Sequence, residues 1–177
     1  MCDFSNGQHA GPTAADEFVL DTPFLREFIG FARSTIAHAA TPEQACECLE
    51  PRFRELLVDH TWLPDEYQRD APASGMGGGI GQWLLFRERG GSLCLFSLVV
   101  PPGAATPVHD HLAFGIVGLY RGSQDEEFFL PEHGALVRTK HRPLLPGDYY
   151  RLIPPRDDIH RVRTTSSTTS VSIHLLA

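Results

Sequence analysis

Three histidines in this sequence are spaced so that one metal ion could bind all of them. His109 and His111 form a His-x-His pair that follows a turn and precedes an apolar segment. Residues two apart on a strand point to the same side, so one metal could take both imidazoles. A third imidazole must come from elsewhere, and His160 is the best candidate because it follows Pro146-Gly147-Asp148 by a short strand and a proline turn. The pattern predicts a three-histidine metal site.

The histidines fall in a part of the chain that is predicted to consist of strands. From residue 82 onward, short apolar or alternating runs are separated by turn residues, which is typical of an all-β sandwich or barrel of the jelly-roll kind. Eight runs are predicted to form strands: 82–87, 93–100, 114–120, 126–130, 136–139, 148–153, 160–163 and 170–176. The His-x-His pair lies between the second and third runs, and His160 begins the seventh.

Two helices are predicted ahead of the strands. Apolar residues recur at helical spacing over residues 23–40, and the proline at the start of this range suits a first helical turn. A second helix is expected to begin at Thr41, an N-cap threonine three residues before Gln44, and to run to about Val58. Pro51 is expected to kink or split this helix, because proline removes a backbone donor.

The length of the chain predicts one domain. A chain of 177 residues can bury one core and is short for two domains. We expect a flexible N-terminal tail at residues 1–20, which are polar and rich in small residues, and a single domain at residues 21–177. Within that domain, residues 21–67 are predicted to be the helical segment and residues 80–177 the β-barrel.

Charge and composition disfavour several classes of partner. A net charge of −7 opposes phosphate backbones and anionic lipid surfaces, so we expect neither nucleic acid nor a membrane as partner. The first twenty residues lack a basic region followed by an apolar run, which predicts a cytoplasmic protein. Four scattered cysteines indicate reduced thiols rather than a disulfide framework. Whether the protein is a monomer or a homo-oligomer is left open.

The segments around the histidines resemble the two motifs of the cupin superfamily. Residues 103–111 with Gly122 resemble the first motif, and residues 147–160 resemble the second. The resemblance implies a mainly β fold, the cupin double-stranded β-helix or jelly-roll barrel, with the predicted pair of α-helices at its N-terminus. Cupins usually offer a glutamate a few residues after His-x-His, and this chain has Phe-Gly-Ile at residues 114–116 instead.

The missing glutamate has a physical consequence. Three neutral imidazoles leave the full double charge on a divalent metal, whereas a site of two histidines and one carboxylate cancels part of it. A three-histidine site therefore favours an anionic ligand. A thiolate is a soft anion that binds iron strongly, and coordination would deprotonate a small thiol near neutral pH. The residues thus indicate thiol oxidation as a candidate chemistry.

Within the cupins, the chain resembles the cysteine dioxygenase group of thiol dioxygenases, in particular bacterial 3-mercaptopropionate dioxygenase-like proteins. The resembling segments are 62–67, 82–85, 106–111, 158–163 and 170–174, together with Gly115 and Gly122. The resemblance implies a non-haem iron(II) enzyme that converts a small thiol, 3-mercaptopropionate or a cysteine-like molecule, with dioxygen to its sulfinic acid. It matches His109, His111 and His160 with the iron ligands.

The resemblance also implies roles for residues around the metal. Ser172 and His174 match a Ser-x-His pair behind the site and are the predicted catalytic residues. Gln82 matches a position that binds the substrate carboxylate, Phe114 stands where bacterial members usually carry tryptophan, and Arg161 is a further candidate for binding the substrate. The strand alternates Val171, Ile173 and Leu175 with Ser170, Ser172 and His174, so the pair is predicted to lie on a polar face.

Other polar residues on the predicted strands are interpreted without a role at the metal. Glu126 and Glu127 are adjacent and face opposite ways, so we interpret them as a solvated edge rather than a carboxylate pair. Cys94 lies in an apolar run and is predicted to be a small core residue. Tyr149 or Tyr150 is expected to project a hydroxyl into the barrel.

Two other interpretations remain open. A different cupin metal-dependent dioxygenase could use the same three histidines on a non-thiol substrate such as a diketone or a catechol. A noncatalytic metal-binding cupin sensor would keep the metal and lack turnover. Leu176 stands where the thiol dioxygenases carry a tyrosine, and this departure favours the sensor. The metal identity beyond a divalent transition metal is also left open.

Overall fold

The computed structural model describes residues 13–71 and 76–177 of the chain. Its helices are α1 (Pro23–His38) and α2 (Pro42–Val58), with short 3-10 turns η1 (Asp65–Tyr67) and η2 (Arg89–Gly91). Its strands are β1 (Glu17–Phe18), β2 (Gly81–Arg87), β3 (Cys94–Val100), β4 (Gly115–Arg121), β5 (Gln124–Glu132), β6 (Ala135–Leu144), β7 (Tyr149–Leu152), β8 (His160–Thr164) and β9 (Ser170–Leu176). None of the described helices is long and apolar enough to span a membrane.

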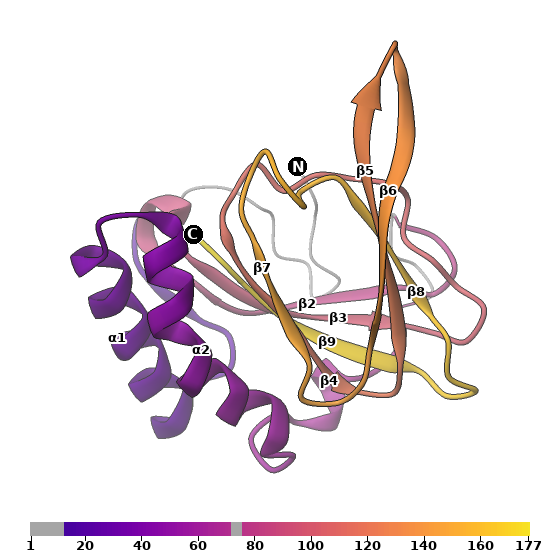
Figure 1. Ribbon diagram of the computed structural model, residues 1–177. Coiled ribbons are helices and arrows are strands. Elements are labelled where there is room, and N and C mark those ends of the chain that lie inside the picture. Colours follow the sequence, from indigo (N-terminus) through magenta and orange to yellow (C-terminus); the bar gives the residue numbers. More distant parts are fainter. Residues whose placement is uncertain (1–12, 72–75) are drawn as a thin grey trace.

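The strands form two antiparallel sheets that pack across a barrel interior (Figure 1). The larger sheet has the order β1-β2-β3-β9-β4-β7 and the smaller one the order β6-β5-β8. Side chains of the two sheets meet inside the barrel, for example Val162 with Leu84 and Phe96, and Phe128 with Val117. The helices lie outside, against the larger sheet. The predicted fold class, a mainly β barrel of the jelly-roll kind with an N-terminal pair of helices, is confirmed.

Strand β9 shows how residue alternation divides the core in two. Val171, Ile173 and Leu175 belong to the core between the larger sheet and the helices. His174 and Leu176 are also buried and line a cavity within the barrel. The predicted alternation is confirmed, and it directs the polar face of the strand into the barrel rather than toward solvent.

The start of α2 is fixed by the predicted capping box. The Gln44 backbone N–H donates to the Thr41 hydroxyl oxygen at 3.2 Å, and the Ala40 N–H donates to the Gln44 side-chain oxygen at 2.7 Å. Pro51 does not split the helix, contrary to our expectation, because α2 is continuous from residue 42 to residue 58. Pro51 and Glu47 are both exposed, so water can replace the hydrogen bond that proline removes from the Glu47 carbonyl.

The predicted flexible tail, residues 1–20, extends too far, because residues near position 20 belong to the folded domain. Residues 1–12 of that prediction lie outside the described residues. Residues 17 and 18 form β1, which pairs with the edge of β2, and the Glu17 carboxylate accepts a hydrogen bond from the Arg87 guanidinium at 2.6 Å. Leu20 is buried in the core. A strand of two residues is too short to leave a periodic signal in the sequence.

The hairpin of β5 and β6 is longer than predicted. It projects beyond the rest of the barrel in Figure 1, and its turn lies at His133 and Gly134, as the sequence indicates. Most of β6 is exposed on both faces. Because neither face is buried along its length, β6 lacks the apolar alternation by which the other strands were recognised.

Gly118 of β4 permits the close approach of α2 to the larger sheet. A Cβ atom at this position would lie 2.4 Å from Leu57 Cδ1 and 2.9 Å from Phe53 Cε1. We expect Gly118→Ala to lower the free energy of unfolding by about 1–3 kcal/mol, measured by urea denaturation, because the helix would be overpacked. Gly30 of α1 is exposed and a Cβ there would meet nothing within 4 Å, so Gly30→Ala should raise the same quantity by up to about 1 kcal/mol. Equal effects of the two substitutions would contradict this account.

Candidate metal centre

Two separated segments bring the three predicted histidines together. His109, in the loop after β3, forms an isolated antiparallel bridge with His160 at the start of β8. The His109 N–H donates to the His160 carbonyl at 3.0 Å, and the His160 N–H donates to the His109 carbonyl at 2.9 Å. One nitrogen from each of His109, His111 and His160 lies within 4.8 Å of the others. The predicted convergence of the three imidazoles is thus present.

Hydrogen bonds on the other side of the rings set their orientation. The Pro107 carbonyl accepts a hydrogen bond from His109 Nδ1 at 2.9 Å, which leaves the lone pair on Nε2. His160 Nδ1 is bonded to a glutamate, Glu126, at 3.0 Å, and its Nε2 is buried without a hydrogen-bond partner in the described part of the chain. A buried imidazole nitrogen without a partner fits a metal cation. The histidine set therefore suits a divalent transition metal.

A buried carboxylate holds the loop that carries His111. The Asp158 carboxylate accepts the backbone N–H of His111 at 2.8 Å and that of Leu112 at 3.3 Å, and Asp158 is only 4% exposed. Leu112 has a positive φ of 56°, a conformation that costs energy for a residue other than glycine. The two hydrogen bonds to Asp158 offset that cost and fix the place of the His111 backbone.

Burial keeps two of the metal-binding imidazoles, those of His109 and His111, neutral. Loss of solvent, with a smaller contribution from the charge of His160, lowers the pKa of His109 to about 4 and that of His111 to about 2. Both rings therefore lack a proton on one nitrogen throughout the neutral pH range. Neutral imidazole is the form that binds a metal, so no proton has to be displaced from these rings first.

Glu126 was wrongly interpreted as a solvated edge residue. It is fully buried, and its Oε2 is bonded to His160 Nδ1. The Tyr150 hydroxyl lies 3.1 Å from the same nitrogen, and burial, followed by the nearby Glu126 carboxylate, raises the pKa of this phenol well above its usual value, so it keeps its proton. The inward-facing Phe128 two residues along β5 was the signal that could have identified Glu126. A carboxylate behind a metal-binding histidine orients the ring and raises its basicity.

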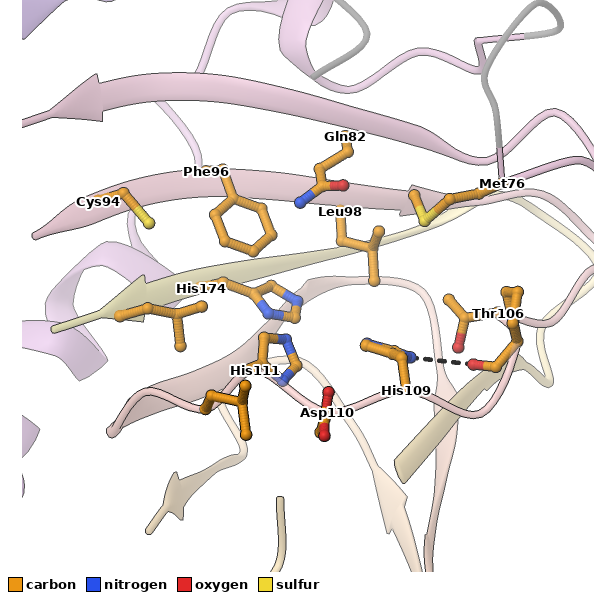
Figure 2. Close-up of a pocket in the computed structure, with 13 residues that line it drawn as sticks. Met76, Gln82, Cys94, Phe96, Leu98, Thr106, His109, Asp110, His111 and His174 are labelled. Atoms are coloured by element: carbon orange, nitrogen blue, oxygen red, sulfur yellow. Dashed lines mark hydrogen bonds between the residues drawn. The ribbon is translucent and has the colours of Figure 1, made fainter. Parts of the chain in front are cut away.

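A cavity of about 490 Å³ lies beside the histidines. Figure 2 shows His109 and His111 on one side of it, Cys94, Phe96 and Leu98 on the other, and His174 between them. Of the predicted site residues, the cavity lining includes Gln82, His109, His111 and His174. Cys94, predicted as a core residue, packs against the core cluster inside the barrel and also lines this cavity.

Ser172 and His174 form the predicted pair. Ser172 is fully buried and its Oγ lies 3.0 Å from His174 Nε2. The His174 ring stacks on Phe96 at a centroid distance of 4.6 Å and lies 6.2 Å from the His111 ring. Burial, and then the neighbouring imidazoles, hold the pKa of His174 well below its usual value, so the ring is neutral. A neutral ring can donate a hydrogen bond from one nitrogen and accept one at the other.

The structure does not bring Phe114 or Arg161 to the cavity. Phe114 packs against the core between the sheet and the helices, and its backbone pairs with Ala177. Arg161 follows His160 on β8, so it faces the other way, and its Nε donates to the Glu127 carboxylate at 2.7 Å. Neither side chain is among the described lining residues, because Phe114 packs against the core on the helix side and Arg161 faces the outer side of β8.

The two tyrosines of β7 point in opposite directions. Tyr150 projects into the barrel, behind His160, as described above. Tyr149 instead reaches Glu50 of α2, with 3.4 Å between its hydroxyl and the carboxylate. The expectation that one of the pair places a hydroxyl inside the barrel is confirmed for Tyr150, although this hydroxyl contacts the histidine from the side opposite its unpartnered nitrogen.

Neighbouring glutamates on β5 allow a matched test of the metal centre. We expect Glu126→Gln to weaken the binding of Zn²⁺ or iron(II) by about 10–100-fold, because the carboxylate behind His160 is lost. Glu127→Gln should leave metal affinity unchanged, since Glu127 bonds Arg138 and Arg161 on the outer face. Competition with a chelator measures both affinities. Equal affinity of the two variants would show that Glu126 does not support the metal ligand.

Comparisons with known proteins show likeness over about half of the chain. No protein family model matches the sequence. A cupin domain from Bordetella pertussis Tohama I is 19% identical over 55% of this chain and 93% of its own, with a TM-score of 0.42. The DMSP lyase DddQ from Ruegeria pomeroyi DSS-3 is 22% identical over 55% of this chain, with a TM-score of 0.42.

The matched region covers the solved proteins to different extents. It spans 46% of the lyase and 50% of Peruvianin-I, a cysteine peptidase from Thevetia peruviana latex that is 21% identical over 48% of this chain, with a TM-score of 0.39. The chain thus spans about half the length of these two proteins. The solved structures similar to this chain include cupin-domain proteins.

Proposed function

We propose that this protein is a non-haem iron(II) thiol dioxygenase that converts a small thiol and dioxygen to a sulfinic acid. The observation that carries the proposal is a metal-binding set made of histidines alone, His109, His111 and His160, beside a cavity. No carboxylate of the described residues belongs to this set: Glu126 contacts the far nitrogen of His160, and Asp158 accepts backbone hydrogen bonds. The set therefore carries no charge of its own.

A neutral ligand set selects the kind of substrate. Because no carboxylate cancels the charge of a divalent cation, the centre favours an anionic ligand, and a thiolate is the soft anion that suits iron. When bound, iron(II) supplies Lewis acidity toward the thiol and one-electron chemistry toward dioxygen. The overall reaction, R–SH plus O₂ giving R–SO₂H, transfers both oxygen atoms to sulfur and needs no external reductant.

Side chains around the cavity would orient the bound substrate and exclude water from it. His174, oriented by Ser172, lies 6.2 Å from His111 between ring centroids, and its Nδ1 has no hydrogen-bond partner within the described residues. This nitrogen is available to hold a polar group of a bound substrate. Phe96, Leu98 and Leu176 form an apolar side of the cavity that keeps water away from the reacting sulfur.

Oxygen consumption tests the proposed activity. Iron-loaded protein should consume dioxygen in the presence of a thiol from the panel cysteine, 3-mercaptopropionate, cysteamine and 2-mercaptoethanol. Mass spectrometry of the product should show the gain of two oxygen atoms. His160→Ala is the matched control, because it removes one imidazole from the metal set. If no thiol supports uptake while a diketone or a catechol does, the thiol assignment is wrong. If no substrate is turned over, the metal-binding protein is not an oxygenase.

His174 gives a test that separates catalysis from metal binding. His174→Phe should keep the full metal content, because His174 is not in the ligand set, and should lower kcat/KM for the oxidised thiol by about 100-fold or more. Ser172→Ala should have a smaller effect, about tenfold, because only the orientation of the ring is lost. A His174→Phe variant with the original kcat/KM would exclude a role for His174 in turnover.

A further inference from the structure

We infer that the substrate of this site is an uncharged thiol with an apolar body, rather than a thiol that carries a carboxylate. The inference rests on the proposed function and concerns the side of the cavity that faces the histidines. It departs from the sequence analysis, which indicated 3-mercaptopropionate or a cysteine-like molecule. The evidence for an uncharged substrate is the charge and the polarity of the residues that line the cavity.

The described lining of the cavity offers no basic side chain to a carboxylate. None of the described lining residues is arginine or lysine. Residues 1–12 and 72–75, which the structure leaves undescribed, contain neither arginine nor lysine in the sequence. A charged residue that does line the cavity is Asp110, and its carboxylate would repel a second one.

The arginines closest in sequence to the cavity strands are held elsewhere. Arg161 donates to Glu127 on the outer side of β8. Arg87, on the same strand as Gln82, bonds Glu17 of β1 at 2.6 Å. Each guanidinium is thus neutralised by a carboxylate that belongs to the fold. A substrate carboxylate would have to replace an existing ion pair to reach either of them.

The side of the cavity that faces the histidines is mostly apolar, and the Gln82 amide lies among Met76, Phe96 and Leu98 (Figure 2). We define the apolar wall as Met76, Phe96, Leu98 and Leu176, all of which line the cavity. A carboxylate placed against this wall would lose its hydration without gaining a cation, which is strongly unfavourable. An alkyl chain in the same place gains about threefold in affinity for each buried methylene. Leu176 extends the wall where the resembled family carries a tyrosine hydroxyl.

The size of the cavity indicates a substrate larger than a three-carbon thiol. Its volume of about 490 Å³ falls in the range of pockets that enclose larger organic ligands, roughly 300–1,000 Å³. Gln82 and Thr106 add neutral polar groups to the lining. Such groups can bond an ester, amide or hydroxyl in the substrate, and the apolar wall accommodates the remaining carbon chain.

A matched pair of thiols tests the inference by binding alone. Protein loaded with Zn²⁺, which cannot support oxidation, is titrated calorimetrically with 3-mercaptopropionate and with its methyl ester, each affinity being expressed per thiolate. We expect the ester to bind at least about tenfold more tightly, and straight-chain thiols from propyl to pentyl to gain about threefold per methylene. Equal or tighter binding of the acid overturns this inference and leaves the proposed function standing. Absence of binding by every thiol overturns both.

Met76 offers a variant that should reverse the preference. It is a half-buried residue of the apolar wall, so a longer polar side chain is tolerated there. Met76→Arg should raise the affinity for the acid relative to the ester by at least about tenfold, because it supplies the missing cation. Met76→Leu, the matched control, should retain the preference for the ester. If the acid-to-ester ratio is the same in both variants, the substrate body does not lie along this wall and the inference fails.

Discussion

The site depends on the reciprocal backbone hydrogen bonds between His109 and His160. These bonds, at 3.0 and 2.9 Å, join a loop to a strand that is distant in the sequence. They place two imidazoles next to each other, with ring centroids 4.6 Å apart and ring planes tilted by 50°, and the next residue but one, His111, completes the set. Because the bridge is made by the main chain, the side chains need no contact with one another to hold their places. A ligand set arranged in this way can meet a cation without rearranging the barrel.

Several buried polar side-chain atoms in the barrel lack a hydrogen-bond partner among the described residues. Glu126, His160 and His174 are buried, and each has a side-chain atom without a hydrogen-bond partner in the described part of the chain. Buried polar atoms of this kind destabilise a fold unless something satisfies them. His160 Nε2 belongs to the candidate metal centre and His174 to the lining of the cavity beside it, so a bound cation and a bound ligand could satisfy these two rings. Stability and occupancy of the site are therefore linked.

Local patterns in the sequence predicted the fold and the three histidines of the site. They failed for side chains whose surroundings depend on contacts with residues far away in the sequence. The spacing of His109 and His111, the Thr41 capping box and the alternation of β9 are local signals, and each is present in the structure. The partner of Glu126 lies 34 residues away, so its burial has no local sign. Arg161 was assigned to the substrate because its ion pair with Glu127 across β5 and β8 cannot be read from one strand alone.

The location of Cys94 in the cavity has a consequence for the protein's own chemistry. An enzyme that oxidises sulfur would be exposed to self-inactivation if it presented a reactive thiolate beside its metal. Burial raises the pKa of Cys94 to about 11, so at neutral pH this sulfur keeps its proton and is a poor nucleophile and a poor ligand. The exclusion of water from this part of the barrel thus keeps the endogenous thiol protonated. The proposed enzyme would therefore distinguish a substrate thiol from the thiol of Cys94 by protonation state as well as by distance from the metal.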